Sequence, residues 1–170
     1  PLYSSAASDV YKRQTFNPRT GFNGLGTVIA STLQPDGKII AAGAFNTYNG
    51  APANGIARLN PDGSLDNNFN TRNTPIRSVT ETVTLQPDGK IIVGGGWNVA
   101  GNGCCNFIVR LNDDGSIDTT FNPGTGAGET IYSSALQPDG KILIGGVFPS
   151  FNGTPISVSY THLRAHETVL

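Results

Sequence analysis

The stretch Leu33-Gln-Pro-Asp-Gly-Lys38 occurs three times in this chain of 170 residues, and its spacing decides the fold. The second copy starts at Leu85 and the third at Leu136, so the offsets are 52 and 51 residues. A second motif, Arg-Leu-Asn-x-Asp-Gly-Ser-x-Asp, starts at Arg58 and again at Arg110, which is also an offset of 52 residues. Two motifs that recur in phase indicate a structural unit of about 52 residues.

Each unit contains two predicted turns. In the first, Pro35 fixes a φ suited to a turn, Asp36 can accept hydrogen bonds from nearby backbone amides, and Gly37 permits a positive φ. The Asp-Gly pair of the second motif predicts another turn, so each unit is expected to form two hairpins, that is, four short strands. The predicted turn residues are Asp36, Gly37, Asp62, Gly63, Asp88, Gly89, Asp114, Gly115, Asp139 and Gly140.

The strand after the first turn is almost continuously apolar, over 38–45, 90–97 and 141–148. Such a run is typical of a strand buried on both faces. A Gly inside it weakens the strand unless another backbone approaches closely, and we attribute that approach to a neighbouring sheet. An aromatic side chain two residues later could fill the space between sheets. The predicted blade core is Gly43, Phe45, Gly95, Trp97, Gly146 and Phe148.

Four-stranded sheets that repeat at this interval suit a β-propeller, in which roughly 4 to 8 blades surround an axis. We therefore predict an all-β fold, a partial β-propeller with three four-stranded antiparallel blades. The predicted blades cover about 16–66, 69–118 and 121–156. Three blades do not close a ring.

The pattern Gln-Pro-Asp-Gly-Lys-Ile-x-x-x-Gly-x-Phe, followed by Arg-Leu-Asn-x-Asp-Gly-Ser-x-Asp-x-x-Phe, resembles the delta-60 repeat β-propeller family over about residues 15–156. Members of that family are mostly long bacterial proteins, often secreted or surface-attached, with no assigned catalytic residues. The resemblance therefore implies an extracellular or cell-surface location rather than an activity. It also implies further blades of the same chain as partners.

The two ends of the chain lack the repeat pattern. We expect 1–14 to be a non-native leader, 15–157 to hold the three repeats, and 158–170 to be a non-native tail, since both ends resemble translated sequencing-adapter sequence. Both histidines, His162 and His166, fall in the tail, where we predict no metal site. The repeats consequently lack histidine, which is the commonest general base and metal ligand.

Charge and composition exclude other classes of protein. The net charge is −1, without a basic cluster, so we predict no nucleic-acid partner. No apolar stretch approaches the roughly 20 residues needed to span a membrane, so we predict no membrane span. The 22 Gly and 11 Pro residues predict many turns and little helix.

Most acidic residues of the repeats recur in turns, and only Glu81, Asp113 and Glu129 do not. A glycosidase needs two carboxylates roughly 5 to 10 Å apart. An enzyme therefore remains an alternative only if its catalytic groups lie outside this chain. Oxygen-bearing side chains stand at alternate positions from Asn60 to Asp66. Because calcium binds several oxygens, a calcium site there remains an alternative to an ordinary turn.

Cys104 and Cys105 are adjacent, in a loop of the middle repeat that the other repeats lack. Two cysteines alone do not make a zinc site. Whether they are oxidised remains open, and an ordinary loop is the favoured interpretation.

Arg58 and Arg110 recur inside third strands that are otherwise apolar, and we expect each to pair with a repeated Asp or with backbone carbonyls. The connections that lead to each Leu-Gln-Pro-Asp-Gly-Lys motif vary in length. Because loops on a rigid scaffold often carry recognition, a binding surface is expected there. The unrepeated charged residues of these connections are Arg19, Arg72, Arg77 and Glu129.

We therefore predict a non-catalytic repeat segment of a larger protein, with a role in binding or scaffolding. It is expected to have no catalytic, cofactor-binding or metal-binding residues. The expected partners are an unidentified protein or carbohydrate and further blades. A passive spacer or adhesin array is the other alternative.

Overall fold

The computed structural model describes residues 16–74, 76, 79–96, 107–156 and 163–165, and every regular element in this part is a β-strand. Three antiparallel sheets of three strands each form what we call the first, second and third blades. The first blade consists of β2 (Thr27–Leu33), β3 (Ile39–Ala44) and β6 (Ile56–Leu59). The second blade consists of β7 (Thr80–Leu85), β8 (Ile91–Gly95) and β9 (Ile108–Leu111). The third blade consists of β10 (Ile131–Leu136), β11 (Ile142–Gly146) and β14 (Leu163–Ala165).

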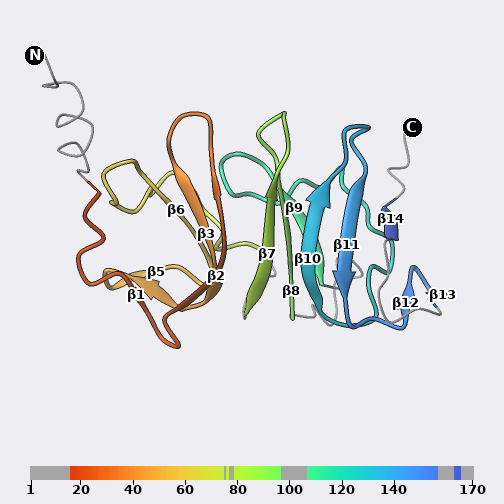
Figure 1. The fold of residues 1–170 in the computed structure, drawn as a ribbon. Coiled ribbons are helices and arrows are strands. Elements are labelled where there is room, and N and C mark those ends of the chain that lie inside the picture. Colours follow the sequence, from red (N-terminus) through yellow and green to blue (C-terminus); the bar gives the residue numbers. More distant parts are fainter. Residues whose placement is uncertain (1–15, 75, 77–78, 97–106, 157–162, 166–170) are drawn as a thin grey trace, which may run out of the picture.

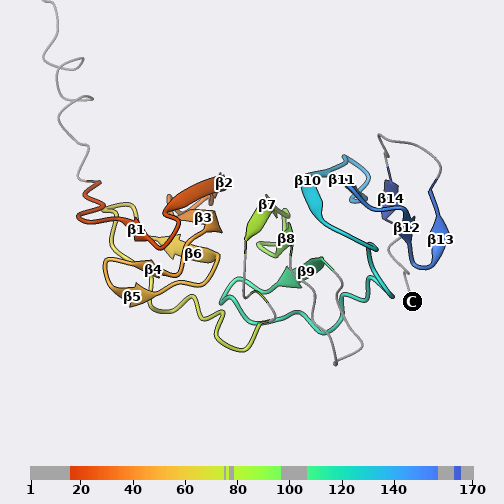
Figure 2. The same cartoon turned by 90° about the horizontal axis from the view of Figure 1, so that it is seen from below.

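The three blades stand side by side, with the hairpin between the first and second strand of each pointing the same way (Figure 1). Seen from below, the blades fan out, and their first strands β2, β7 and β10 lie along one side (Figure 2). Neighbouring first strands are in contact. Between the second and third blades, the backbone N–H of Ser134 donates to Oγ1 of Thr82 at 3.0 Å. The predicted all-β propeller arrangement is confirmed.

The fourth strand of the first and second blades is shorter than predicted. After the second turn only a single β-bridge forms, between Leu59 and Leu65 in the first blade and between Leu111 and Ile117 in the second. Asp66 ends the strand, because its carboxylate accepts the backbone N–H of Asn68 at 2.9 Å and so bends the chain. A three-stranded sheet with one added bridge therefore replaces the expected four strands.

Gly43 makes room for the backbone of a strand in its own blade rather than for another blade. A β-bulge between Val28 and Ala30 brings the β2 backbone over Gly43, where a Cβ would lie 2.1 Å from the carbonyl oxygen of Thr27. Gly146 has the same relation to Thr130, also at 2.1 Å. The close approach that the sequence analysis assigned to a neighbouring sheet is thus made by the neighbouring strand.

Gly95 pairs with Thr80 at the corresponding bulge of the second blade. Its neighbour Gly94 does face another blade, because a Cβ there would lie 3.0 Å from Cγ2 of Ile131 on β10.

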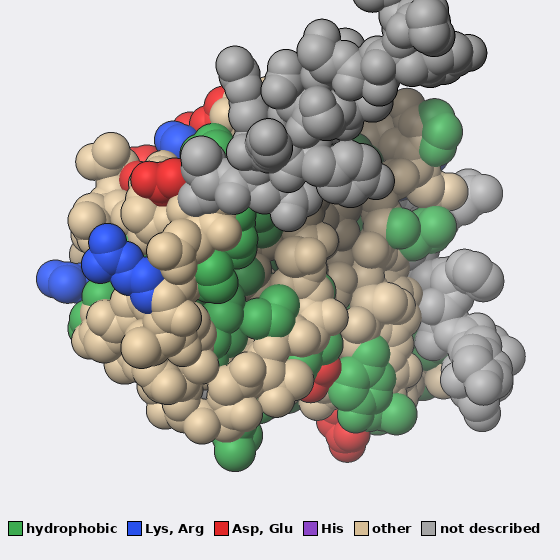
Figure 3. Space-filling model, turned by 60° about the vertical axis from the view of Figure 1, so that its left-hand side comes forward, with side chains coloured by type: hydrophobic (Ala, Val, Ile, Leu, Met, Phe, Trp, Pro, Cys, Tyr) green, Lys and Arg blue, Asp and Glu red, His purple; other side chains and the backbone are tan. Residues whose placement is uncertain are grey.

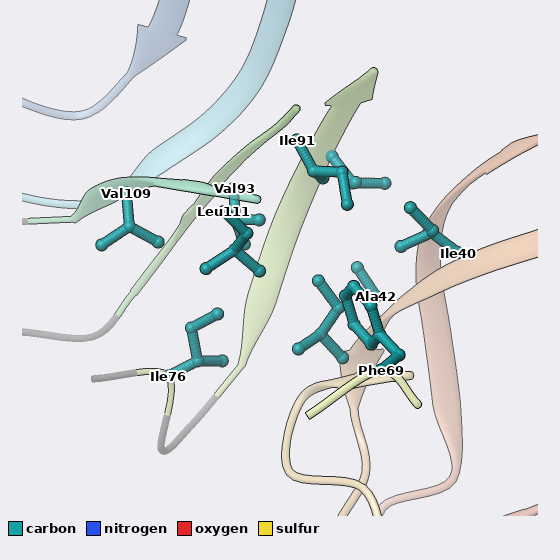
Figure 4. Close-up of a cluster of buried hydrophobic side chains, with 10 residues drawn as sticks. Ile40, Ala42, Phe69, Ile76, Ile91, Val93, Val109 and Leu111 are labelled. Atoms are coloured by element: carbon teal, nitrogen blue, oxygen red, sulfur yellow. The ribbon is translucent and has the colours of Figure 1, made fainter. Parts of the chain in front are cut away.

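The main core lies between the first and second blades. Ile40 and Ala42 on β3 face Ile91 and Val93 on β8, and Phe69 closes the lower side (Figure 4). The apolar residues of β3 alternate, so that Ile40 faces the second blade while Ile39 faces the other way. Both faces of the strand are covered, which explains its continuous apolar sequence.

The predicted core aromatics have different surroundings. Phe148 is 6% exposed and lies in a cluster that joins Ile92 and Ile108 of the second blade to Ile142 and Ile144 of the third. Phe45 is 3% exposed but packs within its own repeat, where its ring centroid lies 4.2 Å from that of Phe22. Trp97 falls outside the described residues.

Short hairpins lie between the second and third strands of the first and third repeats. In the first repeat β1 (Phe22–Asn23) pairs with β4 (Thr47–Tyr48), which pairs with β5 (Ala51–Pro52). The third repeat has an equivalent hairpin of β12 (Ser150–Phe151) and β13 (Thr154–Pro155).

β14 comes from the segment that the sequence analysis set aside as a tail, yet its backbone pairs with β11 where a third strand belongs. Arg164 pairs with Leu143, as Arg110 pairs with Ile92 in the second blade. A strand edge offers the same row of backbone donors and acceptors to any extended segment, so this pairing requires none of the repeat motif. Separately, the described residues include no helix that could cross a membrane.

Candidate functional site

The antiparallel order of the strands gives the blades two different ends. The turns from first to second strand and from third to fourth strand lie at one end, which we call the turn end. The loops between second and third strands lie at the other, which we call the loop end, together with the last residues of each connection before the next first strand (Figure 1). The connections begin at the turn end, where the N–H of Asn70 donates to the carbonyl of Asp114. The repeated motifs therefore gather at the turn end.

The first turn has the same geometry in all three repeats. In each, the Asp side chain accepts the backbone N–H of the Lys two residues later, at 3.1 Å from Asp36, 3.1 Å from Asp88 and 3.2 Å from Asp139. The three glycines that follow have φ between 82° and 84°. The residues of the motif are thus used to make the turn itself. The glycines are Gly37, Gly89 and Gly140.

The second turn is closed by serine. Oδ1 of Asp62 accepts both the hydroxyl of Ser64 at 2.7 Å and its backbone N–H at 2.9 Å, and these two bonds lower the pKa of Asp62. Asp114 has the same two bonds with Ser116, and its pKa is lowered for the same reasons. In the described residues no three His, Cys, Asp or Glu side chains are arranged to hold a metal ion.

Arg58 is buried, and its pairing with a repeated Asp and a backbone carbonyl, expected from the sequence, is confirmed. Its Nε donates to Oδ2 of Asp66 at 2.9 Å, and its Nη1 donates to the carbonyl oxygen of Asp113 at 2.5 Å. The guanidinium lies 4.9 Å from the ring centroid of Phe69. Lys38 completes the cluster, with Nζ 3.2 Å from Oδ2 of Asp66.

The pKa of Asp66 reflects these contacts. Burial alone would raise it, but the N–H of Asn68, the ammonium of Lys38 and the guanidinium of Arg58 together lower it. Asp118, in the same position of the second repeat, likewise has a strongly lowered pKa, since burial is outweighed by hydrogen bonds from Thr120, Lys90 and Arg110. Both carboxylates are therefore held ionised.

Asp113 joins two blades. Its Oδ1 accepts Nη1 of Arg58 at 2.9 Å and Nε2 of Gln34 at 3.1 Å, both from the first blade. The adjacent Asp114 carbonyl accepts the backbone N–H of Asn70 at 2.8 Å. From the sequence Asp113 is recognisable only as an unrepeated acid, because nothing local shows that it meets Arg58 across 55 residues.

The loop end is fastened by an asparagine that the sequence analysis did not single out. Asn49 has φ 49°, and its Oδ1 accepts the N–H of Gly21 and the hydroxyl of Thr20, both at 2.9 Å. In the third repeat Oδ1 of Asn152 accepts the N–H of Gly126 at 3.1 Å. The signal that could have found it is an aromatic-Asn-Gly-x-Pro pattern, present at Tyr48-Asn-Gly-Ala-Pro52 and Phe151-Asn-Gly-Thr-Pro155.

The unrepeated charged residues are spread over the structure. Arg19, Arg72 and Glu129 are exposed in connections, whereas Glu81 lies on β7 and Asp113 at the turn end. Seen from the first-blade side, the surface is mostly uncharged, with basic and acidic side chains at the upper left and further acidic side chains at the lower edge (Figure 3). Predicted residues that fall outside the described part of the chain are Arg77, Cys104, Cys105, His162 and His166.

Comparison with protein families gives one match. A family described as a domain of unknown function (DUF5122) beta-propeller matches residues 34–69, 86–121 and 137–155, which together are more than half of the chain. The matched segments begin at the first turn and, in the first two repeats, end at Phe69 and Phe121. No match was found among curated proteins.

Proposed function

The chain belongs to the DUF5122 β-propeller family of domains of unknown function, and from that premise we propose that it is a non-catalytic segment that binds a protein or carbohydrate at its loop end. In this proposal it works outside the cell or on the cell surface of a bacterium, as part of a larger chain. Further repeats pack against it as additional blades.

The observation that carries the proposal is the division between the two ends. The repeated polar residues of the turn end bond to one another, as Asp62 does to Ser64 and Arg58 does to Asp66. The loop end instead presents the exposed side chain of Glu129, which does not recur in the other repeats and lies in the connection that leads into β10. A scaffold that keeps its framework constant and varies one set of loops suits recognition.

The non-catalytic part of the proposal is supported by how the acidic residues are used. Among the residues that the structure describes, Asp113 is the one unrepeated acid at the turn end, and Arg58 and Gln34 bind its carboxylate. Glu81 and Glu129 lie on different elements, one in β7 and one in the connection that precedes β10. The location outside the cell is supported by the family resemblance alone.

Binding of the purified chain to a glycan array and to an array of extracellular protein domains tests the proposal. For any ligand found, Glu129→Gln is expected to weaken binding by about tenfold, since a few loop side chains usually dominate such contacts. Asp88→Asn is the matched control, because it removes one negative charge, as Glu129→Gln does, but at the turn end.

Equal losses in Glu129→Gln and Asp88→Asn would place the binding surface elsewhere and contradict the proposal. Absence of binding on both arrays would favour the passive spacer instead.

A further inference from the structure

We propose that the outer face of the first blade binds the outer face of the third blade of a second copy of this chain, so that copies associate head to tail. By outer face we mean the side of the blade that points away from the second blade. The face on the first blade is formed by Val28, Ser31 and Leu33 of β2, and the face on the third blade centres on Ser133 and Gly145. This inference rests on the proposed packing of further blades and names a second copy as their source.

The strand pairing shows which way these residues face. In the first blade Leu33 pairs with Ile39, which belongs to the cluster on the outer side of that blade. In the third blade Ile142 and Ile144 pack against the second blade. Because side chains alternate along a strand, the next residue, Gly145, lies on the outer face.

The contact between the second and third blades shows how two such faces fit together. Gly94 of the second blade leaves room for Ile131 of the third, whose Cγ2 would lie 3.0 Å from a Cβ at Gly94. Beside it, Oγ1 of Thr82 lies 2.9 Å from Oγ of Ser134. Ile131 is 0% exposed and Thr82 is 6% exposed. An apolar side chain over a glycine, next to a pair of hydroxyl groups, therefore joins these two blades.

β2 presents one half of this contact. Val28 corresponds to Ile131, since each pairs with a glycine of the second strand at the start of a β-bulge. Ser31 follows Val28 by three residues, as Ser134 follows Ile131. Val28 is 43% exposed, Leu33 is 67% exposed and Ser31 is exposed as well. The first blade thus exposes the residues that the third blade buries against its neighbour.

The outer face of the third blade presents the other half. Gly145 pairs with Ser133, as Gly94 pairs with Thr82 in the second blade. A Cβ at Gly145 would meet the Ser133 hydroxyl at 2.7 Å and no further atom of the described residues within 4 Å. Ser133 is exposed. The space over Gly145 is therefore open to a side chain such as that of Val28.

The two faces lie at opposite ends of the row of blades (Figures 1 and 2). The contact is therefore made between chains, with Val28 of one copy over Gly145 of another and Ser31 beside Ser133. Every copy carries both halves, so a second copy completes the contact without any other partner. Removal of Val28 and Leu33 from water favours the association.

The turn end of the first blade is already prepared for such a partner. Where the first two blades meet, the N–H of Asn70 donates to the carbonyl of Asp114 at 2.8 Å. The turn of the first blade has the equivalent bond within its own chain, because the N–H of Asn17 donates to the carbonyl of Asp62 at 2.9 Å. A partner blade consequently has to supply strands alone.

Sedimentation of the full chain over a range of concentrations tests the proposal, and the natural chain is expected to self-associate. Ser31→Lys and Ser133→Glu each place a charge in one of the two faces. Each should weaken self-association tenfold or more, because the contact would bury an unpaired charge. Asn73→Glu is the matched control, since it adds a charge at an exposed position of the connection between the first two blades and should associate as the natural chain does.

An equimolar mixture of Ser31→Lys and Ser133→Glu chains separates head-to-tail association from other arrangements. The first variant keeps its third-blade face and the second keeps its first-blade face, so the mixture should form a one-to-one complex although neither variant associates alone. Equal unfolding midpoints of the variants and the natural chain check that both variants fold. If Ser133→Glu alone associated like the natural chain, copies would be meeting through other surfaces, and the inference would be wrong.

A photo-crosslinking residue in place of Val28 locates the contact, and the label is expected on β10 or β11 of another copy, near Gly145. Labelling confined to β2, or a natural chain that sediments as a monomer at every concentration, would overturn the inference. Because the measurement uses no loop-end ligand, its failure is distinguishable from failure of the proposed binding function.

Discussion

Oδ1 of Asp113 in the second blade lies 2.9 Å from Nη1 of Arg58 in the first, although 55 residues separate the two in sequence. Arg58 is 4% exposed, and it also donates to the backbone carbonyl of Asp113 and to the buried carboxylate of Asp66. The contact between these blades is therefore partly ionic, at the edge of an otherwise apolar core.

Asp113→Asn is expected to lower the free energy of unfolding by about 1 kcal/mol, because the carboxylate is well exposed but its partner is buried. Urea denaturation measures the change. Asp88→Asn, in a turn that meets no other blade through its carboxylate, should change stability by less. In an Arg58→Lys background the effect of Asp113→Asn should shrink, and an undiminished effect would show that the two residues are not coupled.

Gly115→Ala is expected to be much more damaging than Gly89→Ala. Both glycines have φ near 84°, at 85° and 84°, so each substitution costs about 1 kcal/mol or more in backbone strain. At Gly89 a Cβ meets nothing within 4 Å, whereas at Gly115 it lies 2.9 Å from the backbone of Asn70. The additional overpacking should cost a further 1–3 kcal/mol or so. Equal midpoints in urea would contradict the close approach between blades.

Stability should fall at acidic pH, and Asp66 should contribute to the fall. Its pKa in the folded chain is lowered below the ordinary value of 3.8, so the unfolded chain takes up the proton first as the pH drops. The stabilisation is therefore complete above about pH 5 and is lost as the pH falls through the folded-state pKa. Asp66→Asn should be less stable than the natural chain at pH 7, with a difference that narrows towards pH 2. A constant difference in unfolding free energy across this range would exclude the mechanism.

Asn49→Gly should loosen the first connection while keeping the turn. Glycine accepts the φ of 49° but cannot bind the N–H of Gly21 or the hydroxyl of Thr20. Hydrogen exchange at residues 20–23 is expected to accelerate, with exchange in the turn at 86–90 unchanged. Asn49→Ala adds backbone strain and should also reduce global stability. Unchanged exchange in Asn49→Gly would mean that the carboxamide does not hold the connection.

Phe148→Ala should cost about 3–5 kcal/mol, because the ring is 6% exposed between the second and third blades. Val147→Ala, one residue earlier and 53% exposed, should change stability by about 0.5 kcal/mol or less. Thermal and urea unfolding compare the two. Similar losses would show that Phe148 does not join these blades.

The turns and strands could be predicted because their determinants are local and repeat in phase. Asp36, Gly37 and Lys38 form hydrogen bonds within one hairpin. The continuously apolar sequence of β3 results from the burial of both its faces. A fourth strand that continues to about Phe69 was wrong, because the carboxylate of Asp66 bends the chain at Asn68 and only the bridge between Leu59 and Leu65 forms.

The close approaches between backbone segments that are distant in sequence could not be predicted from the repeat pattern. Gly43 is predicted from the sequence to make room for a neighbouring sheet, because the sequence does not show the bulge that brings Thr27 over it. Gly63 and Gly115 were explained by the turn alone, although each also admits the backbone of an asparagine from a neighbouring segment. Such pairings depend on how two sheets meet, which no stretch of one repeat encodes.

The docking of the second-blade turn on the first blade gives this pair of blades a direction. The surface that donates from Arg58 and Asn70 differs from the surface that offers the Asp113 carboxylate and the Asp114 carbonyl, so the two are complementary and not identical. A contact of this kind is heterologous: it can be repeated until a ring closes or continued into a fibre, but it cannot relate two copies by a twofold axis. Any assembly through these surfaces therefore has polarity, with every blade facing the same way around.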